Sequence, residues 1–226
     1  MKLKKIFSLA ILGSMIMSNS SATYALDTHL GNIPGANITG TEDSFIITAD
    51  KTVTNKQAFL DSIKLPEITN RTYSKPFSLY DKQIETVDDR YETRNYNICA
   101  MLETDASVDY YDDFIVIDQS LTQVSWMEDD PIASDSIRLV ESFTLEGSEV
   151  SLGGSLGGGW SLSGSVSPTR QTITYKSSAT NEWTISHVTR NKALHGRASK
   201  LTQTVVGEFT LGTQNFDVEA RDYYRV

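Results

Sequence analysis

The sequence predicts an all-β protein: an antiparallel β-sandwich with one short helix and a long amphipathic hairpin rich in glycine and serine. Three observations favour this fold class. Apolar and polar residues alternate in many runs, turn residues separate these runs, and a single stretch has helical spacing. Once a leader segment is removed, about 200 residues remain, enough for one β-domain with a single core.

The first 25 residues have the features of a secretory signal peptide. Three lysines precede an apolar run over residues 6–16, and small residues lead to a cleavage position after Ala25, with a cut after Ala22 as the alternative. The apolar run is too short for a permanent membrane span. The sequence therefore predicts a secreted, extracellular protein, and a lysine-rich leader without a disulfide framework indicates bacterial export.

The mature chain is acidic and has one cysteine. The formal net charge is −9, and removal of a leader with three lysines and no acid gives −9 − 3 = −12. Such a chain is repelled by nucleic acid and by anionic lipid, so neither is expected as an electrostatic partner. Cys99 has no second cysteine to pair with and is predicted to be a buried small hydrophobic residue.

The elements before the hairpin follow from local patterns. Residues 26–44 lack periodicity, which predicts an extended N-terminal arm before a single β-rich domain over 45–226. After a strand over 45–49, a helix is expected over 55–64, with Thr54 as its N-cap and Pro66 beyond its end. Further β-branched and aromatic runs predict short strands separated by polar turns, over 73–79, 96–102, 114–117 and 121–126.

The chain is organised around an alternating ribbon over residues 149–168. Its large apolar side chains all fall on even positions, and the odd positions after Glu149 hold only serine or glycine, which gives one strand two different faces. A strand over 137–145 and a polar turn over 146–149 complete the predicted hairpin. Strand patterns then continue to the C-terminus, with runs over 183–185, 205–211 and 216–218. The apolar stripe of the ribbon consists of Val150, Leu152, Leu156, Trp160, Leu162 and Val166.

No catalytic, cofactor-binding or metal-binding constellation is predicted. Ser155 lies in a Gly-x-Ser-x-Gly match, but this nucleophile motif needs a strand–turn–helix context and no helical pattern follows it. His187 and His195 have no partner at a recognisable spacing. Acidic clusters between the strands favour solvated turns over calcium ligands, although calcium stays open. The sequence thus predicts that the protein is not an enzyme.

The run over residues 143–177 contains the segment SLGGSLGGGWSLSGSVS, followed by an alternating strand that includes Thr172, Ile173, Thr174, Tyr175 and Lys176. This run resembles the stem region of the leukocidin and hemolysin type of β-barrel pore-forming toxins. The resemblance implies a stem hairpin that leaves a β-sandwich and joins copies from other subunits in a transmembrane barrel.

Three interpretations of the ribbon follow. It is a core strand of a soluble sandwich, a membrane stem, or a flat strand that pairs with other chains along its edge. The expected function is that of a secreted, non-catalytic protein that acts by binding or self-assembly at an extracellular surface. The alternative is a β-hairpin pore-forming toxin. The expected partner is an extracellular ligand or a second copy, with membrane contact and oligomerisation left open.

Overall fold

The computed structural model describes residues 33–68, 75–89, 94–109, 114–151 and 159–225. The predicted leader and residues 26–32 of the predicted arm lie outside this part of the chain. The elements are, in order, β1 (Ala36–Thr41), β2 (Ser44–Asp50), α2 (Lys56–Ser62), β3 (Lys75–Asp89), β4 (Arg94–Asp109), β5 (Phe114–Trp126), β6 (Ser136–Ser151), β7 (Ser161–Ser167), β8 (Arg170–Thr180), β9 (Glu182–Leu211) and β10 (Gln214–Arg225).

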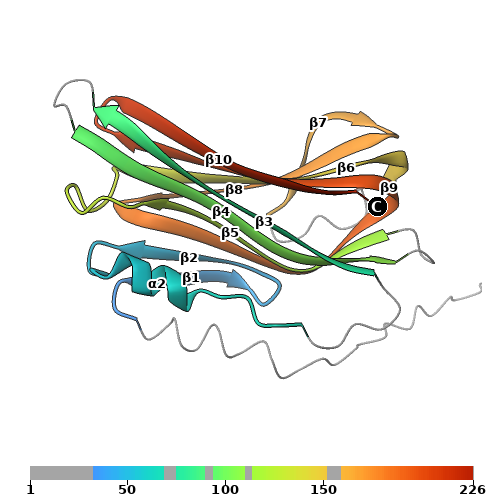
Figure 1. The fold of residues 1–226 in the computed structure, drawn as a ribbon, viewed down its shortest axis with the longest axis horizontal. Helices are drawn as coiled ribbons and strands as arrows, with labels where there is room; N and C mark the ends of the chain where they lie inside the picture. Colours follow the sequence, from blue (N-terminus) through green and yellow to red (C-terminus); the bar gives the residue numbers. More distant parts are fainter. Residues whose placement is uncertain (1–32, 69–74, 90–93, 110–113, 152–158, 226) are drawn as a thin grey trace, which may run out of the picture.

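The strands form one antiparallel sheet that is folded into two layers around β9. The strand order is β3-β4-β5-β9-β6-β8-β7, with β10 and β2 also paired to β9 and β1 paired to β2. The first part of the 30-residue β9 pairs with β5 and β2, whereas its second part pairs with β6 and β10. Because β9 belongs to both layers, it connects them without a loop (Figure 1).

Aromatic side chains fill the space between the layers. Phe77 on β3 stacks on Tyr224 of β10 with ring centroids 3.8 Å apart, and Tyr96 contacts both Trp126 and Phe216. Burial of such rings is the main favourable contribution to the stability of a sandwich core. The all-β fold class and the single short helix within the described residues are therefore confirmed.

The helix α2 covers one layer near β2, and Figure 1 shows both along the lower side of the molecule. Phe59 of α2 meets Trp183 edge to face, with centroids 5.6 Å apart. The predicted helix is confirmed over Lys56–Ser62, but its N-cap is Asn55 rather than Thr54. The side-chain oxygen of Asn55 accepts the backbone N–H of Ala58, which satisfies one of the unpaired donors at the helix start.

Two predicted strand breaks are not breaks in the structure. The runs over 114–117 and 121–126 form the single strand β5, and the register with β4 skips Asp118, because Asp105 pairs with Gln119 and Ala106 with Ile117. Such an irregularity interrupts the sequence pattern without ending the strand. The later runs over 183–185 and 205–211 are likewise parts of one strand, β9.

The predicted turn over residues 146–149 is wrong, because β6 continues through it to Ser151. The register with β9 shifts on both sides of Gly147, which marks an irregularity within the strand. A Cβ atom on Gly147 would lie 2.0 Å from the carbonyl oxygen of Arg197, so glycine is needed for the close approach of the two strands. Gly147, which suggested a turn in the sequence, therefore allows the close pairing of β6 and β9.

The ribbon over 149–168 is consequently not one continuous strand. Its first residues end β6 and pair with β9, whereas Ser161–Ser167 form β7 and pair with β8. The hairpin observed here is β7–β8, with its turn at Pro168 and Thr169. Part of the predicted arm also differs, since Ala36–Thr41 form β1, and the alternating Ala36 and Ile38 pack against the core.

Candidate functional site

The structure divides the predicted apolar stripe between different environments. Val150 is buried at the end of β6, and Trp160 is buried directly before β7. Leu162 on β7 is 41% exposed. The side chains of the remaining members lie outside the described part of the structure: Leu152, Leu156 and Val166. The stripe is therefore neither wholly in the core nor wholly on the surface.

Trp160 anchors the start of β7 in an aromatic cluster. Its ring lies 5.3 Å from Phe143 on β6, 5.7 Å from Tyr175 on β8 and 5.8 Å from His187 on β9, measured between ring centroids. The indole Nε1 is buried without a hydrogen-bond partner. A buried N–H without an acceptor costs about 1–3 kcal/mol, which offsets part of the gain from packing the ring.

Beneath Trp160 lies a buried pair of ionisable groups. His187 Nδ1 is 2.6 Å from Glu141 Oε2, and neither side chain has any exposed surface. With Glu141 ionised, Nδ1 is the donor of this contact, because a carboxylate only accepts hydrogen bonds. The imidazole also stacks on Tyr175, with ring centroids 3.7 Å apart and planes inclined by 6°. Burial, and then the nearby Glu141 charge, raise the pKa of Tyr175.

Glu141 accepts hydrogen bonds from four side chains. His187 and Thr122 bind Oε2, and the contact from Thr122 Oγ1 is 3.1 Å long. Ser120 and Gln203 bind Oε1 at 3.4 and 2.9 Å. These residues come from β5, β6 and both parts of β9, so the polar network crosses the space between the two layers. A buried carboxylate with this many donors is well compensated for its loss of hydration.

The network reaches the β1–β2 hairpin through Ser44. Ser44 Oγ lies 2.9 Å from His187 Nε2, and Thr189 Oγ1 lies 3.3 Å from the same nitrogen. Serine, histidine and carboxylate thus follow the hydrogen-bond order of a hydrolase triad. His187 and Glu141 are both fully buried, however, whereas a general base must reach the leaving group of a substrate. The arrangement therefore suits a role in joining β2, β6 and β9.

Sequence patterns missed this network, although one signal was present. Glu141 occupies an odd position in the run where Ile137, Leu139, Phe143 and Leu145 form the apolar stripe of β6. A carboxylate at a core-facing position needs a buried partner. Its partner, His187, is 46 residues away along the chain, and only the tertiary structure brings the two together.

The other candidate residues named from the sequence, where the structure describes them, do not belong to the Glu141–His187 network. Ser155 lies outside the described residues, and His195 is exposed on β9 beside Phe114. Glu128, from an acidic cluster, accepts both the backbone and the side-chain N–H groups of Asn97. Cys99 is buried, and burial raises the pKa of its thiol. Among the described residues, no group of three or more His, Cys, Asp or Glu side chains is placed to hold a metal ion.

Comparison with known proteins assigns no family. No family model and no curated protein matches the chain. One solved structure, described as manganese lipoxygenase of Gaeumannomyces graminis with a partial structure of zonadhesin of Komagataella pastoris, is 6% identical over 85% of this chain and 94% of that chain. Its TM-score of 0.22 establishes no common fold. In the described part of the chain, no helix has the length and apolar character of a membrane span.

Proposed function

We propose that this chain is a secreted, non-catalytic protein that acts by binding or self-assembly at an extracellular surface, with β7 as the element that engages the partner. The carrying observation is the place of β7 at the end of the sheet order, where it pairs with β8 and presents Leu162 to solvent. Figure 1 shows β7 at the upper right, far from α2. A terminal strand offers backbone hydrogen-bonding groups to a further strand.

The attachment of β7 supports this role. The register between β7 and β8 is irregular between Ser163 and Ser167, whereas β8 pairs with β6 in an unbroken register from Ser136 to Glu146. Its anchor, Trp160, keeps an unpaired N–H in the interior. Release of β7 would return that N–H to water, so the packing lost on release is opposed by a gain in hydration. We infer that β7 is less firmly held than the other strands around the network.

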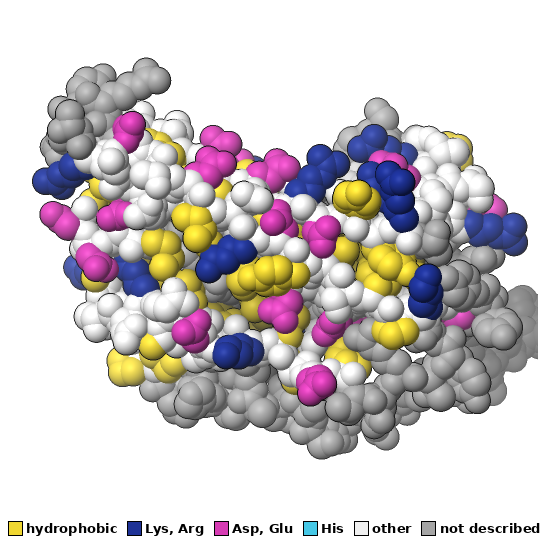
Figure 2. Space-filling model, viewed as in Figure 1, with side chains coloured by type: hydrophobic (Ala, Val, Ile, Leu, Met, Phe, Trp, Pro, Cys, Tyr) yellow, Lys and Arg dark blue, Asp and Glu magenta, His cyan; other side chains and the backbone are white. Residues whose placement is uncertain are grey.

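A pore-forming toxin is the second candidate, and the composition of the ribbon favours it. Residues 150–168 contain no charged side chain, although 22% of the whole chain is charged. Uncharged alternating strands satisfy the requirements of a barrel wall, with apolar side chains toward lipid. Figure 2 shows acidic and basic side chains interspersed over one face of the resting protein. Because Val150 and Trp160 of the ribbon are buried, lipid contact through the ribbon would require its rearrangement.

One substitution separates these functions from a purely structural role of β7. Leu162→Asp places a charge at an exposed position, so the thermal melting temperature should stay close to that of the wild type. Ile84→Asp is the matched control, because Ile84 is 61% exposed on β3, away from the ribbon. If β7 engages a partner, Leu162→Asp should weaken self-association or surface binding, and Ile84→Asp should not.

Sedimentation velocity and dye release from neutral-lipid vesicles are the two measurements. Dye release by wild type and by Ile84→Asp, but not by Leu162→Asp, supports the stem. Association without release supports assembly at a surface. Unchanged association, adsorption and release in Leu162→Asp would contradict the role of β7.

The non-catalytic part of the proposal is tested at Ser44. A fluorophosphonate that labels activated serines should leave the wild-type protein unmodified, because His187 is fully buried. Labelling of wild type that disappears in Ser44→Ala would establish an activated nucleophile and overturn this part of the proposal.

A further inference from the structure

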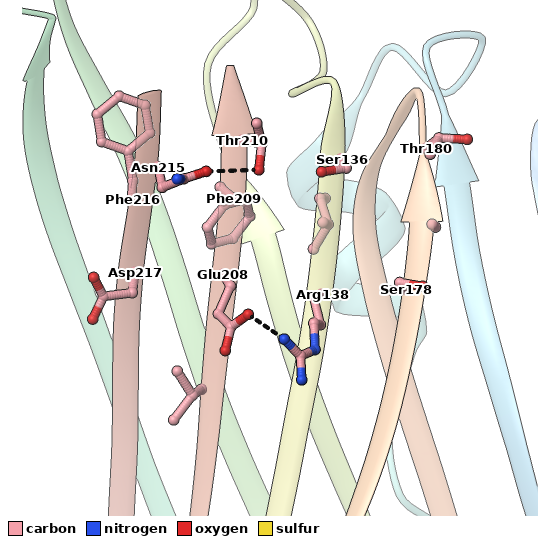
Figure 3. Close-up of a pocket in the computed structure, with 13 residues that line it drawn as sticks. Ser136, Arg138, Ser178, Thr180, Glu208, Phe209, Thr210, Asn215, Phe216 and Asp217 are labelled. Carbon is pink, nitrogen blue, oxygen red and sulfur yellow. Dashed lines mark hydrogen bonds and ion pairs between the residues drawn. The ribbon is translucent and has the colours of Figure 1, made fainter. Parts of the chain in front are cut away.

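A groove of about 700 Å³ crosses four strands on the outer side of the layer formed by β10, β9, β6 and β8. Figure 3 shows that side chains from all four strands project into it. The groove lies outside the Glu141–His187 network and does not include β7. It is thus independent of the residues on which the proposed function rests.

The strand register arranges the polar side chains of this groove in two parallel rows. In one row, Arg138 on β6 lies between Ser178 on β8 and Glu208 on β9, and Glu208 pairs with Asp217 on β10. The second row lies two residues away on each strand, on the same side of the first row, and consists of Thr180, Ser136, Thr210 and Asn215. Both rows are visible in Figure 3.

Two contacts hold side chains of the groove in place. Arg138 Nη1 donates to Glu208 Oε2 at 2.9 Å, and both side chains are nearly half exposed. Thr210 Oγ1 donates to the amide oxygen of Asn215 at 3.0 Å, which leaves the amide NH₂ of Asn215 directed elsewhere. Fixed donors and acceptors lose less conformational freedom when a ligand binds than mobile side chains do.

The charges of the groove select against anions and against a purely apolar ligand. One guanidinium faces two carboxylates, and the mature chain as a whole carries an excess of acidic groups. An anionic ligand would meet a net repulsion here. Hydroxyl, amide, carboxylate and guanidinium groups, alternating at the spacing of neighbouring strands, are complementary to a ligand with many hydroxyl groups.

We propose that this groove binds an uncharged carbohydrate. The carboxylates of Glu208 and Asp217 accept hydrogen bonds from sugar hydroxyls, and Arg138 and the Asn215 amide donate to hydroxyl or ring oxygens. Val206, half-buried on β9 two residues before Glu208, offers a small apolar surface to the carbon-bound hydrogens of a sugar ring. This inference adds a ligand class to the proposed action at an extracellular surface, and its readout is binding in the groove rather than assembly through β7.

The test uses the full-length mature protein and an immobilised panel of neutral oligosaccharides that end in glucose, galactose, mannose or N-acetylglucosamine, beside sialylated and sulfated ones. We expect selective binding to at least one neutral oligosaccharide. Asp217→Ala and Arg138→Ala should each weaken it by roughly tenfold or more, a loss that corresponds to one good polar contact. Arg170→Ala is the matched control, because it removes a cross-strand pair with Glu146 between the same β6 and β8 strands but outside the groove.

Binding that survives both groove substitutions would overturn the proposal, and so would preference for the anionic oligosaccharides. The proposal would also be overturned if no neutral oligosaccharide bound at a concentration of about 10 mM, which is above the Kd of ordinary ligand recognition. Melting curves of the variants establish that they are folded. If the groove variants lose sugar binding but keep β7-dependent assembly, the result supports the groove as the binding site and is independent of the role proposed for β7.

Discussion

Substitution of Glu141 by alanine gives the sharpest test of the buried network. In the folded protein the carboxylate accepts four hydrogen bonds. Gln203 and Ser120 keep each other as partners when the carboxylate is removed, because Gln203 Nε2 also donates to Ser120 Oγ at 2.9 Å. His187 Nδ1 and Thr122 Oγ1 lose the acceptor that the structure gives them.

Each donor left without an acceptor in the interior costs about 1–3 kcal/mol. Two donors lose their acceptor, so we expect Glu141→Ala to lower the free energy of unfolding by about 2–6 kcal/mol, and the melting temperature by roughly 4–24 °C for a domain of this size. Glu141→Gln should cost less, about 1–3 kcal/mol, because the amide oxygen still accepts on one side.

Urea unfolding at pH 7, followed by tryptophan fluorescence, measures these differences. The comparison requires that the m-value, the slope of the unfolding free energy against urea concentration, is the same in each variant. Glu146→Ala is the control, since Glu146 forms a partly exposed pair with Arg170 at 3.5 Å. Such a pair contributes about 0–1 kcal/mol. If Glu141→Ala destabilised the protein no more than Glu146→Ala, the network would not be buried and continuous as described.

Three further substitutions test other features of the fold. Burial, and then the charge of Asp50, raise the pKa of Glu182 from 4.5 to about 7, so this group favours the folded state below pH 4.5 and loses that contribution as pH rises through 7. Glu182→Gln should therefore raise the melting temperature at pH 8 more than at pH 4. Gly147→Ala, which forces a Cβ against Arg197, should cost about 1–3 kcal/mol or more in urea unfolding, and a stable variant would contradict the close strand approach. Asn55→Ala should cost about 0.5–2 kcal/mol by the same assay, and no loss would argue against Asn55 as the helix cap.

The sequence alone determined the all-β fold class, the helix and the apolar face of strands such as β6. Alternation at Ile137, Leu139, Phe143 and Leu145 predicted β6, and the spacing of Ala58, Phe59 and Ile63 predicted α2. These properties depend on the geometry of a single element, because side chains repeat every two residues on a strand and every 3.6 on a helix. The all-β fold class follows from such local signals taken together.

The tertiary structure decided which strands pair, where strands continue, and which polar groups meet. Nothing local distinguishes Gly147 within a strand from glycine in a turn, because the difference lies in the approach of Arg197 from β9. The same holds for Glu141 and His187, which only the pairing of β6 and β9 brings to 2.6 Å. Alternation reports the two faces of a strand but not its neighbours, and register is set by contacts between distant residues. For that reason the buried network and the two polar rows of the groove depend on the assembled sheet.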